Sequence, residues 1–305
     1  MKLETDMQIT CRKVAVLSDI HSNSHALHAC LADARQQGAD AYIFLGDLVT
    51  GLAEPAETMA LIHALRADFP TVCIRGNRER NLIDYHEGRT PLSRGSFTGS
   101  FLFTYDRLEP EDIDYLASLP ASCTITVNST VFELAHALKD HDRFYFDAAS
   151  DSIGAAYAQM DADYLLTGHS HKQYTASAGG KTIINPGSVG LPQGGGWEAQ
   201  YALLTAADGE AACELRRVPY DREALVHAQF SCGVMDFARY WALGDLYGAL
   251  TGEEYTKMLL TKLFMREFDS PGAVQNEALW HRYAAELGMR FTEAEVLEAL
   301  RSGTL

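Results

Sequence analysis

The stretch "KVAVLSDIHSN", residues 13–23, runs from a short apolar segment into a polar tail that holds an aspartate and a histidine. Its apolar and β-branched part predicts a buried strand over residues 13–19. The segment that follows, 24–37, places apolar residues at helical spacing, and Gly38 ends it. A strand that leads directly into an amphipathic helix is typical of a βαβ unit.

The same alternation continues for two more strands. "AYIFLGD" (residues 41–47) and "TVCIRGN" (residues 71–77) resemble strands, and residues 57–67 between them place apolar side chains on one helical face. Strands that alternate with helices at this interval predict a mostly parallel sheet. Residues 78–120 are predicted to be helical and irregular.

Antiparallel structure is predicted after residue 120. Segments rich in β-branched residues are joined by turn-favouring pairs at Asn128-Ser129, Gly179-Gly180 and Asp208-Gly209. They predict three hairpins, over residues 122–136, 173–186 and 200–220, and one further strand at 162–168. A second sheet packed beside the first is therefore expected.

The pattern becomes helical beyond about residue 225. A break is expected near Gly252, an N-cap and first helical position at Ser270 and Pro271, and a capping box at Thr292 and Glu295. We therefore predict two parts, an α/β domain over residues 1–225 and a helical C-terminal extension over residues 226–305. The extension could cap an active site on the first part and select its substrate, or it could join copies in a homo-oligomer, and the sequence leaves both roles open.

Composition limits the classes of function. The chain has 305 residues, of which 47% are hydrophobic and 22% charged, as in soluble globular proteins. It has no apolar run of about 18 residues and no apolar leader segment, so we expect a cytoplasmic protein without a membrane partner. Six cysteines without a CxxC pair indicate reduced thiols. A net charge of −16 without a Lys/Arg cluster argues against binding of duplex nucleic acid.

Side chains that can bind metal ions follow the predicted strands. Because the carboxyl ends of parallel strands meet at one edge of a sheet, these side chains could converge there. One Zn²⁺ takes about four ligands, so seven oxygen and nitrogen ligands fit two ions that share one ligand. Such a pair of ions is used in phosphoester hydrolysis. The candidate ligands are Asp19, His21, Asp47, Asn77, His136, His169 and His171.

The order of these motifs resembles a known family. D-x-H (residues 19–21), G-D (46–47), G-N (76–77), a lone histidine and G-H-x-H (168–171) follow one another as in the calcineurin-like metallophosphoesterases. With "NPGSVG" at residues 185–190, the set of motifs is most similar to that of the small bacterial phosphodiesterase branch of that family. The resemblance covers residues 13–220. It implies an α/β (α+β) fold, a four-layer αββα sandwich of two mixed sheets flanked by helices.

The resemblance also implies a ligand set and a mechanism. One ion would take Asp19, His21, Asp47 and His171, and the other would take Asp47, Asn77, His136 and His169, so that Asp47 bridges the pair. Nitrogen and oxygen ligands without a thiolate suit Mn²⁺, which we expect first, and also Fe, Ni²⁺, Co²⁺ or Zn²⁺. A hydroxide that bridges the two ions would attack the phosphorus in line.

Arg78 departs from the pattern of that family. Many members have a histidine after the metal-binding asparagine, where it stabilises the transition state or protonates the leaving group. An arginine can hold a phosphate oxygen, but its high pKa makes it a poor proton donor. We therefore place Arg78 with Asn77 and His136 among the catalytic residues and expect a diester or anhydride substrate. The segment after "NPGSVG" also has Gln193 and Glu198 where related sequences often have arginine.

The expected activity is that of a phosphodiesterase or nucleotide pyrophosphohydrolase acting on a small phosphoester or nucleotide. A phosphomonoesterase, including a phosphoprotein phosphatase, is one alternative, and a non-catalytic binding module, the use made of this fold in a retromer subunit, is another. Among single residues, His141 competes with His136 as a ligand, and Asn77 could be an ordinary turn residue. "NPGSVG" could serve as a turn or meet an anion through its backbone N–H groups.

Overall fold

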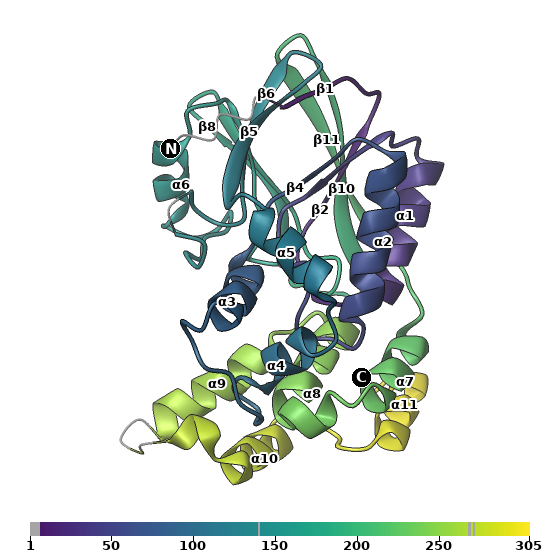
Figure 1. The fold of residues 1–305 in the computed structure, drawn as a ribbon, viewed down its shortest axis with the longest axis vertical. Helices are drawn as coiled ribbons and strands as arrows, with labels where there is room; N and C mark the ends of the chain where they lie inside the picture. Colours follow the sequence, from purple (N-terminus) through teal and green to yellow (C-terminus); the bar gives the residue numbers. More distant parts are fainter. Residues whose placement is uncertain (1–6, 140, 268–269, 271) are drawn as a thin grey trace.

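The computed structural model describes residues 7–139, 141–267, 270 and 272–305. Its strands form two sheets that lie face to face, and the C-terminal helices lie at one end of these sheets (Figure 1). All six cysteines are free thiols. Within the described ranges, no helix has both the length and the hydrophobicity that a membrane span requires.

The first sheet has five strands in the order β11-β10-β2-β3-β4. β2 (Val14–Leu17), β3 (Ala41–Phe44) and β4 (Thr71–Cys73) run parallel, while β10 (Ala199–Ala207) pairs antiparallel with β2 and with β11 (Glu210–Val218). Helices α1 (Ser24–Gln36) and α2 (Pro55–Asp68) connect the parallel strands. The predicted βαβ units are confirmed, although each strand ends a few residues earlier than expected.

The second sheet has six strands in the order β1-β5-β6-β7-β9-β8. The hairpins of β5 (Ser122–Val127) with β6 (Thr130–Ala135), and of β8 (Gln173–Ala178) with β9 (Lys181–Pro186), lie on either side of β7 (Tyr164–Leu166). The sequence analysis missed β1 (Met7–Ile9), which pairs with β5, and helix α6 (Ile153–Gln159). Both elements are too short to show a clear hydrophobic period.

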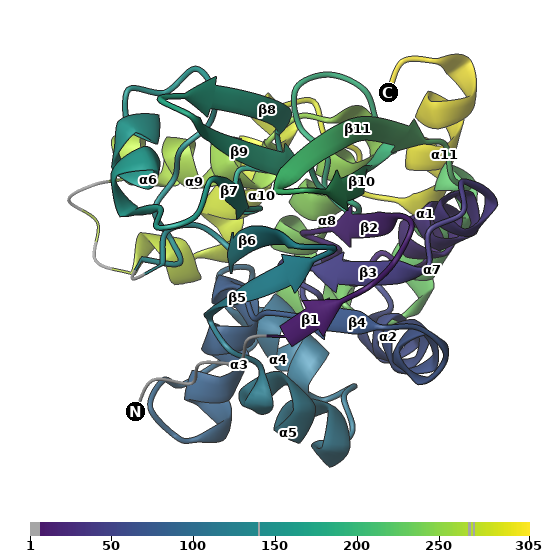
Figure 2. The ribbon, with the colours of Figure 1, turned by 90° about the horizontal axis from the view of Figure 1, so that it is seen from above.

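Apolar side chains from both sheets fill the space between them. Val16, Ile43 and Val72 of the first sheet are buried in one cluster with Ile125 and Phe132 of the second. On the outer faces, α1 and α2 pack against the first sheet and α6 packs against the second. Figure 2 shows these four layers, and the predicted αββα sandwich is confirmed.

The remaining helices lie outside the sandwich. The break at Gly252 is confirmed, since this residue ends α8 with a φ of 80°, and Thr292 and Glu295 form the predicted capping box. The N-cap predicted at Ser270 and Pro271 involves Pro271, which lies outside the described residues. These helices are α3 (Asn77–His86), α4 (Gly99–Tyr105), α5 (Pro110–Ser118), α7 (Arg222–Ser231), α8 (Met235–Thr251), α9 (Tyr255–Arg266), a 3₁₀ helix (Ala273–Gln275), α10 (Glu277–Glu286) and α11 (Glu293–Ser302).

Helix α8 joins the C-terminal part to the sandwich. Leu246 and Tyr247 of α8 are buried in the same cluster as Ile20 and Leu48, which belong to the loops after β2 and β3. The C-terminal helices therefore lie over the carboxyl ends of the parallel strands (Figure 1), where ligands bind in α/β proteins. The first of these helices begins at Arg222, and a division into two domains near residue 225 stays a prediction.

Candidate metal centre

The polar residues at the strand ends occupy a rarely used backbone conformation. A positive φ is uncommon for residues other than glycine, and clusters of such residues usually mark functional sites. Backbone hydrogen bonds join the turns: the Asp19 N–H donates to the Gly46 carbonyl and the His21 N–H donates to the Asp47 carbonyl, both at 3.0 Å. The left-handed residues at these turns are Asp19 (φ 54°), His21 (52°), Ser22 (62°), Asp47 (51°), His169 (65°) and His171 (57°).

Glycines beside these residues allow the loops to approach one another. A Cβ atom on Gly76 would overlap the carboxylate of Asp47, and one on Gly168 would overlap the side chains of Ser18 and Asp19. Any larger residue at either position would push the loops apart. The glycines of the G-N and G-H motifs are therefore steric requirements of the site.

Two groups of side chains bring ligand atoms together at the centre of these loops, and the atoms of each group lie within 4.8 Å of one another. In the first group, Asp19 Oδ1 lies 3.2 Å from Nε2 of His171 and 3.8 Å from Nε2 of His21. In the second group, which contains Asp19, Asp47 and His136, the Nε2 of His136 lies 3.4 Å from Asp47 Oδ2. Asp19 belongs to both groups, whereas the resemblance implied Asp47 as the shared ligand. Asp47 Oδ2 is also 3.8 Å from Nε2 of His21, which belongs to the first group. Each of the two carboxylates therefore lies near histidines of both groups.

The other predicted ligands lie beside these groups. Asn77 is the first residue of α3 and has no left-handed backbone, and its buried Oδ1 has no hydrogen-bond partner in the described part of the chain. The rings of His169 and His136 meet edge to face with centroids 5.2 Å apart, but His169 belongs to neither group. His141 is exposed and its N–H closes a turn with Leu138, so the fold brings His136 to the centre and leaves His141 outside.

Backbone carbonyls orient three of the histidines. An imidazole whose Nδ1–H donates to a carbonyl is left with Nε2 as its free nitrogen. In each of these three residues, Nε2 is the nitrogen that faces the carboxylates, which is the orientation required for metal binding through Nε2. Nδ1 lies 3.2 Å from the Thr50 oxygen in His21, 2.7 Å from the Leu45 oxygen in His136 and 2.8 Å from the Leu191 oxygen in His171.

Burial and mutual interaction move the pKa values of these groups away from their usual range. Burial alone would raise the pKa of Asp19, but the charges of His171 and His136 lower it to about 2. Burial alone would lower the pKa of His136, but the charges of Asp47 and Asp19 raise it to about 10. Burial and the neighbouring His171 lower the pKa of His21 to about 3. Two ionised carboxylates in a buried place require positive charge, and a protonated His136 supplies it in the absence of metal.

The donor set fits divalent cations. Asp19 Oδ1, His136 Nε2 and Asn77 Oδ1 are buried and have no hydrogen-bond partner among the described residues. Buried polar atoms are normally paired, so the unpaired Asp19 Oδ1 and His136 Nε2, which lie 3.9 Å apart, indicate a group that would pair with both. Carboxylate oxygens, imidazole nitrogens and an amide oxygen together suit Mn²⁺, Fe, Co²⁺, Ni²⁺ or Zn²⁺.

Glu79 is a residue of the site that the sequence analysis gave no role. Its fully buried carboxylate accepts hydrogen bonds from the backbone N–H groups of Gly76 at 2.7 Å, Asp47 at 2.9 Å and Leu48 at 2.8 Å. It thereby ties the loop after β3 to the start of α3. Burial and the charge of Asp47 raise the pKa of Glu79 to about 7. Glu79, the third residue of α3, accepts from the N–H of the N-cap residue Gly76, but glycine has no side chain to complete a capping box, so the sequence carries no such signal for this role.

The "NPGSVG" segment donates hydrogen bonds to the loops that carry the candidate ligands. Asn185 Nδ2 donates to the Gly168 carbonyl at 2.7 Å, and the Ser188 hydroxyl donates to the Asp19 carbonyl at 2.6 Å. The Gly187 N–H donates to Asn185 Oδ1 at 2.9 Å and is therefore occupied within the turn. Of the two interpretations of this segment, the geometry supports the structural turn.

A cavity of about 260 Å³ opens at the centre. Its lining includes His169 and His171 from the strand loops, Arg78 from α3, and Trp241 and Asp245 from α8. The sequence analysis interpreted Trp241 as packing between the helices and the core, and this residue is buried, but it also lines the cavity. Helix α8 therefore forms part of the candidate site.

Arg78 lies against two aromatic rings beside the carboxylates. Its Cζ atom is 5.3 Å from the centre of the Phe101 ring and 5.6 Å from that of Trp241, distances at which a guanidinium and a ring attract each other. Its Nε is 3.8 Å from Asp47 Oδ2, and its backbone N–H donates to Asp47 Oδ1 at 2.8 Å. The side chain is thus held at the edge of the centre, with part of it in the cavity.

Comparison with known families agrees with this geometry. Residues 13–209 match the model of the calcineurin-like phosphoesterase superfamily domain, a range that contains all seven candidate ligands. The chain belongs to this superfamily. The resemblance to the calcineurin-like family that the sequence shows is confirmed. The C-terminal helices lie outside the matched range.

Individual relatives agree in fold. The chain is similar to an uncharacterized protein of Methanocaldococcus jannaschii, MJ0912, with 29% identity over 225 residues, which are 68% of this chain and 88% of that protein. A hypothetical protein of Pyrococcus horikoshii, PH1004, superposes with a TM-score of 0.65 at 20% identity, covering 79% of this chain and 99% of the other. A metallophosphoesterase of Sphaerobacter thermophilus superposes with a TM-score of 0.59 at 24% identity, covering 75% and 98%.

Replacing Glu79 by alanine should loosen the centre without removing a candidate ligand. The change leaves the N–H groups of Gly76, Asp47 and Leu48 buried without their acceptor, which should lower the free energy of unfolding by about 3 kcal/mol or more. Affinity for Mn²⁺ should fall about 10- to 100-fold, as for other residues that orient ligands. Thermal unfolding and calorimetric titration measure both effects. Glu57→Ala, at an exposed position of α2, should change neither, and wild-type metal affinity in Glu79→Ala would contradict the orienting role.

Metal binding should release protons near neutral pH. With a pKa of about 10, His136 is protonated in the metal-free protein, and a cation must displace that proton to reach Nε2. The affinity for Mn²⁺ should therefore rise as the pH is raised from about 6 to about 9. Calorimetry in buffers of different ionisation enthalpy counts the released protons, and His136→Asn should release about one fewer. Equal release by both proteins would show that the proton comes from elsewhere.

Proposed function

We propose that the chain is a phosphodiesterase or nucleotide pyrophosphohydrolase that uses two divalent cations, with Mn²⁺ as the first candidate. The proposal is carried by the convergence of two buried carboxylates, Asp19 and Asp47, with three histidines, His21, His136 and His171. One ion would leave part of this ligand set unused, whereas two ions near the carboxylates would use all of it. A binding module has no need of so complete a set.

The chemistry of hydrolysis divides between the cations and the protein. Two bound cations would activate water and offset the negative charge that grows on the phosphoryl oxygens. The oxygen of water bonds to phosphorus, the bond from phosphorus to the leaving oxygen breaks, and the proton released from water goes to solvent or to the leaving group. The residues of the cavity hold the phosphate in the geometry that this displacement requires.

Arg78 supports a diester or anhydride substrate over a simple monoester. Arg78 lines the cavity beside the metal centre, and a guanidinium can hold a phosphate oxygen through its planar fork of donors. A guanidinium does not give up a proton near neutral pH. A leaving group that needs protonation therefore receives no help from Arg78, whereas a phosphate or another stable anion leaves without it.

Purified protein loaded with Mn²⁺ should hydrolyse bis(4-nitrophenyl) phosphate, which is measured as release of 4-nitrophenol. Asp47→Ala should lower kcat by about 10³-fold or more, because this carboxylate contacts both groups of histidines. Asp68→Ala, at an exposed position of α2, is the matched control and should keep full activity. Faster hydrolysis of 4-nitrophenyl phosphate than of the diester would favour the phosphomonoesterase. No hydrolysis with Mn²⁺, Ni²⁺, Co²⁺ or Zn²⁺ would contradict the enzyme.

Arg78→Ala should lower kcat/KM for the diester by about 10- to 100-fold, the effect expected for loss of a charge-assisted contact. Arg78→Lys should recover only part of this, since it keeps the charge but not the planar fork of donors. Elemental analysis should find wild-type metal content in both variants. Loss of metal from Arg78→Ala would instead assign the residue to support of the metal centre through Asp47.

A further inference from the structure

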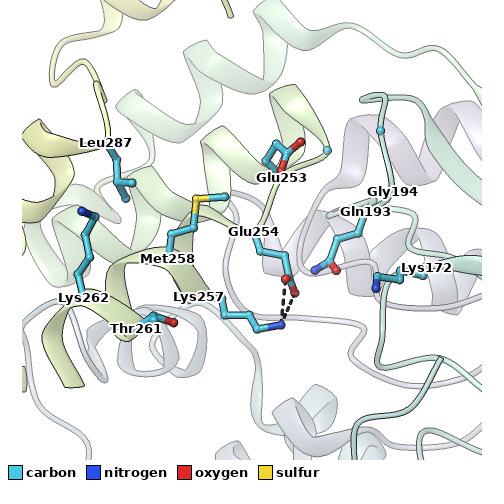
Figure 3. A pocket seen from close by; sticks show the side chains of 12 residues that line it. Lys172, Gln193, Gly194, Glu253, Glu254, Lys257, Met258, Thr261, Lys262 and Leu287 are labelled. Carbon is cyan, nitrogen blue, oxygen red and sulfur yellow. Dashed lines mark hydrogen bonds and ion pairs between the residues drawn. The ribbon is translucent and has the colours of Figure 1, made fainter. Parts of the chain in front are cut away.

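The cavity at the metal centre continues into a larger groove. The groove has a volume of about 580 Å³ and shares the residues Gln193, Glu253, Glu254 and Lys257 with the lining of the cavity. Beyond this junction it follows helix α9 as far as Lys262, and Figure 3 shows the side chains that line it. A ligand held at the metal centre can therefore extend along α9.

Lysine is concentrated in this groove. The chain has seven lysines and a net charge of −16, yet Lys172, Lys257 and Lys262 all line the groove. Lys172 directly follows His171 of the metal centre. Lys257 and Lys262 are about 7.5 Å apart along the axis of α9, and in the view of Figure 3 Lys257 lies between the other two lysines. Ammonium groups are therefore present from the edge of the metal centre to the middle of the helix.

Each of these lysines has a carboxylate partner and N–H groups to spare. An ion pair exposed to solvent, such as that of Lys257 with Glu254, contributes only about 0–1 kcal/mol, and an ammonium group has three donors. A phosphate carries about 1.5 to 2 negative charges at neutral pH, so it can use the remaining donors or compete with a carboxylate for them. The pairs are Lys172 Nζ with Asp147 at 2.6 Å, Lys257 Nζ with Glu254 at 2.9 Å and Lys262 Nζ with Glu286 at 3.1 Å.

The other lining residues indicate where an anion can lie. Glu253 is exposed at the junction of the cavity and the groove, and its charge opposes an anion at that point. Farther along, Met258 and Leu287 offer apolar surface next to Lys262. An organic spacer can cross the junction, and a charged group is better placed beyond it, near the lysines of α9.

We propose that this groove is a subsite for a second phosphate group of the substrate, one that is not cleaved, attracted by Lys257 and Lys262. The substrate class is a phosphodiester or pyrophosphate compound whose organic arm ends in a further phosphate. The inference rests on the proposed function, since the cleaved phosphate is the one held at the metal centre. The C-terminal helices then select the substrate, the first of the two roles that the sequence left open.

Binding of matched ligands to the Mn²⁺-loaded protein tests the subsite without relying on turnover. Alkanediol bisphosphates of increasing chain length are compared by calorimetry with alkyl monophosphates of the same length, so that only the second phosphate differs. At the best length the bisphosphate should bind about tenfold tighter or more, the gain expected from charge-assisted contacts. Equal affinity of the two ligand types at every length overturns the proposal.

Variants locate the second phosphate. Lys262→Ala should remove most of the bisphosphate preference and leave the affinity for monophosphates unchanged. Lys257→Ala should also remove most of the preference, with a smaller loss of affinity for monophosphates because Lys257 lines the cavity as well, and Lys257→Arg should keep the preference because it keeps the charge. Lys139→Ala, an exposed lysine that pairs with Asp161 outside the groove, is the matched control. A preference that survives both alanine variants overturns the assignment to the groove.

The two proposals fail in different ways. Hydrolysis of bis(4-nitrophenyl) phosphate without any bisphosphate preference leaves the proposed function intact and overturns the subsite. A lysine-dependent bisphosphate preference in a protein that hydrolyses no phosphoester supports the subsite and contradicts the function. The calorimetric comparison therefore decides the inference whatever the activity assay finds.

Discussion

Two buried carboxylates, Asp19 and Asp47, determine much of the surrounding structure. Removing an ionised carboxylate from water costs several kcal/mol unless charges and hydrogen bonds replace the lost water. Here the Ser18 hydroxyl and the His169 N–H donate to Asp19, and the Arg78 N–H donates to Asp47. The left-handed turns and the close-approach glycines bring these donors within reach. Two negative charges held this close together favour cations over any neutral ligand.

The strand ends and their ligands could be predicted from the sequence because each has a local cause. A buried parallel strand is a continuous apolar run, so the first polar residue after it marks the edge of the sheet. Six of the candidate ligands lie in loops that follow strands of the two sheets, and Asn77 begins α3 shortly after β4. The choice of His136 over His141 follows from the same rule, since His136 directly follows β6 while His141 lies several residues beyond it.

The rest depended on contacts between distant parts of the chain. Strand β1 is three residues long and exists because it pairs with β5, more than a hundred residues later. Glu79 matters because its carboxylate meets the backbone of a loop about 30 residues earlier in the chain, which no local pattern reports. The cavity residues of α8 and α9 likewise gain their role only from where these helices pack. An amphipathic pattern predicts a buried face but not the surface that covers it.

Arg78, which departs from the family's sequence pattern, contacts a helix that lies outside the family match. A long flexible side chain loses conformational entropy when it is held in one position, so it needs partners that hold it. Trp241 of α8 places its ring against the guanidinium group. Asp245, one turn later, also lines the cavity. Burial raises the pKa of Asp245, and the charge of Arg78 partly offsets this rise. The arginine is therefore held in part by Trp241, from a helix that the matched range, residues 13–209, does not include. The loops of the matched range place the candidate metal ligands, and α8 and α9, outside that range, supply further residues of the cavity lining.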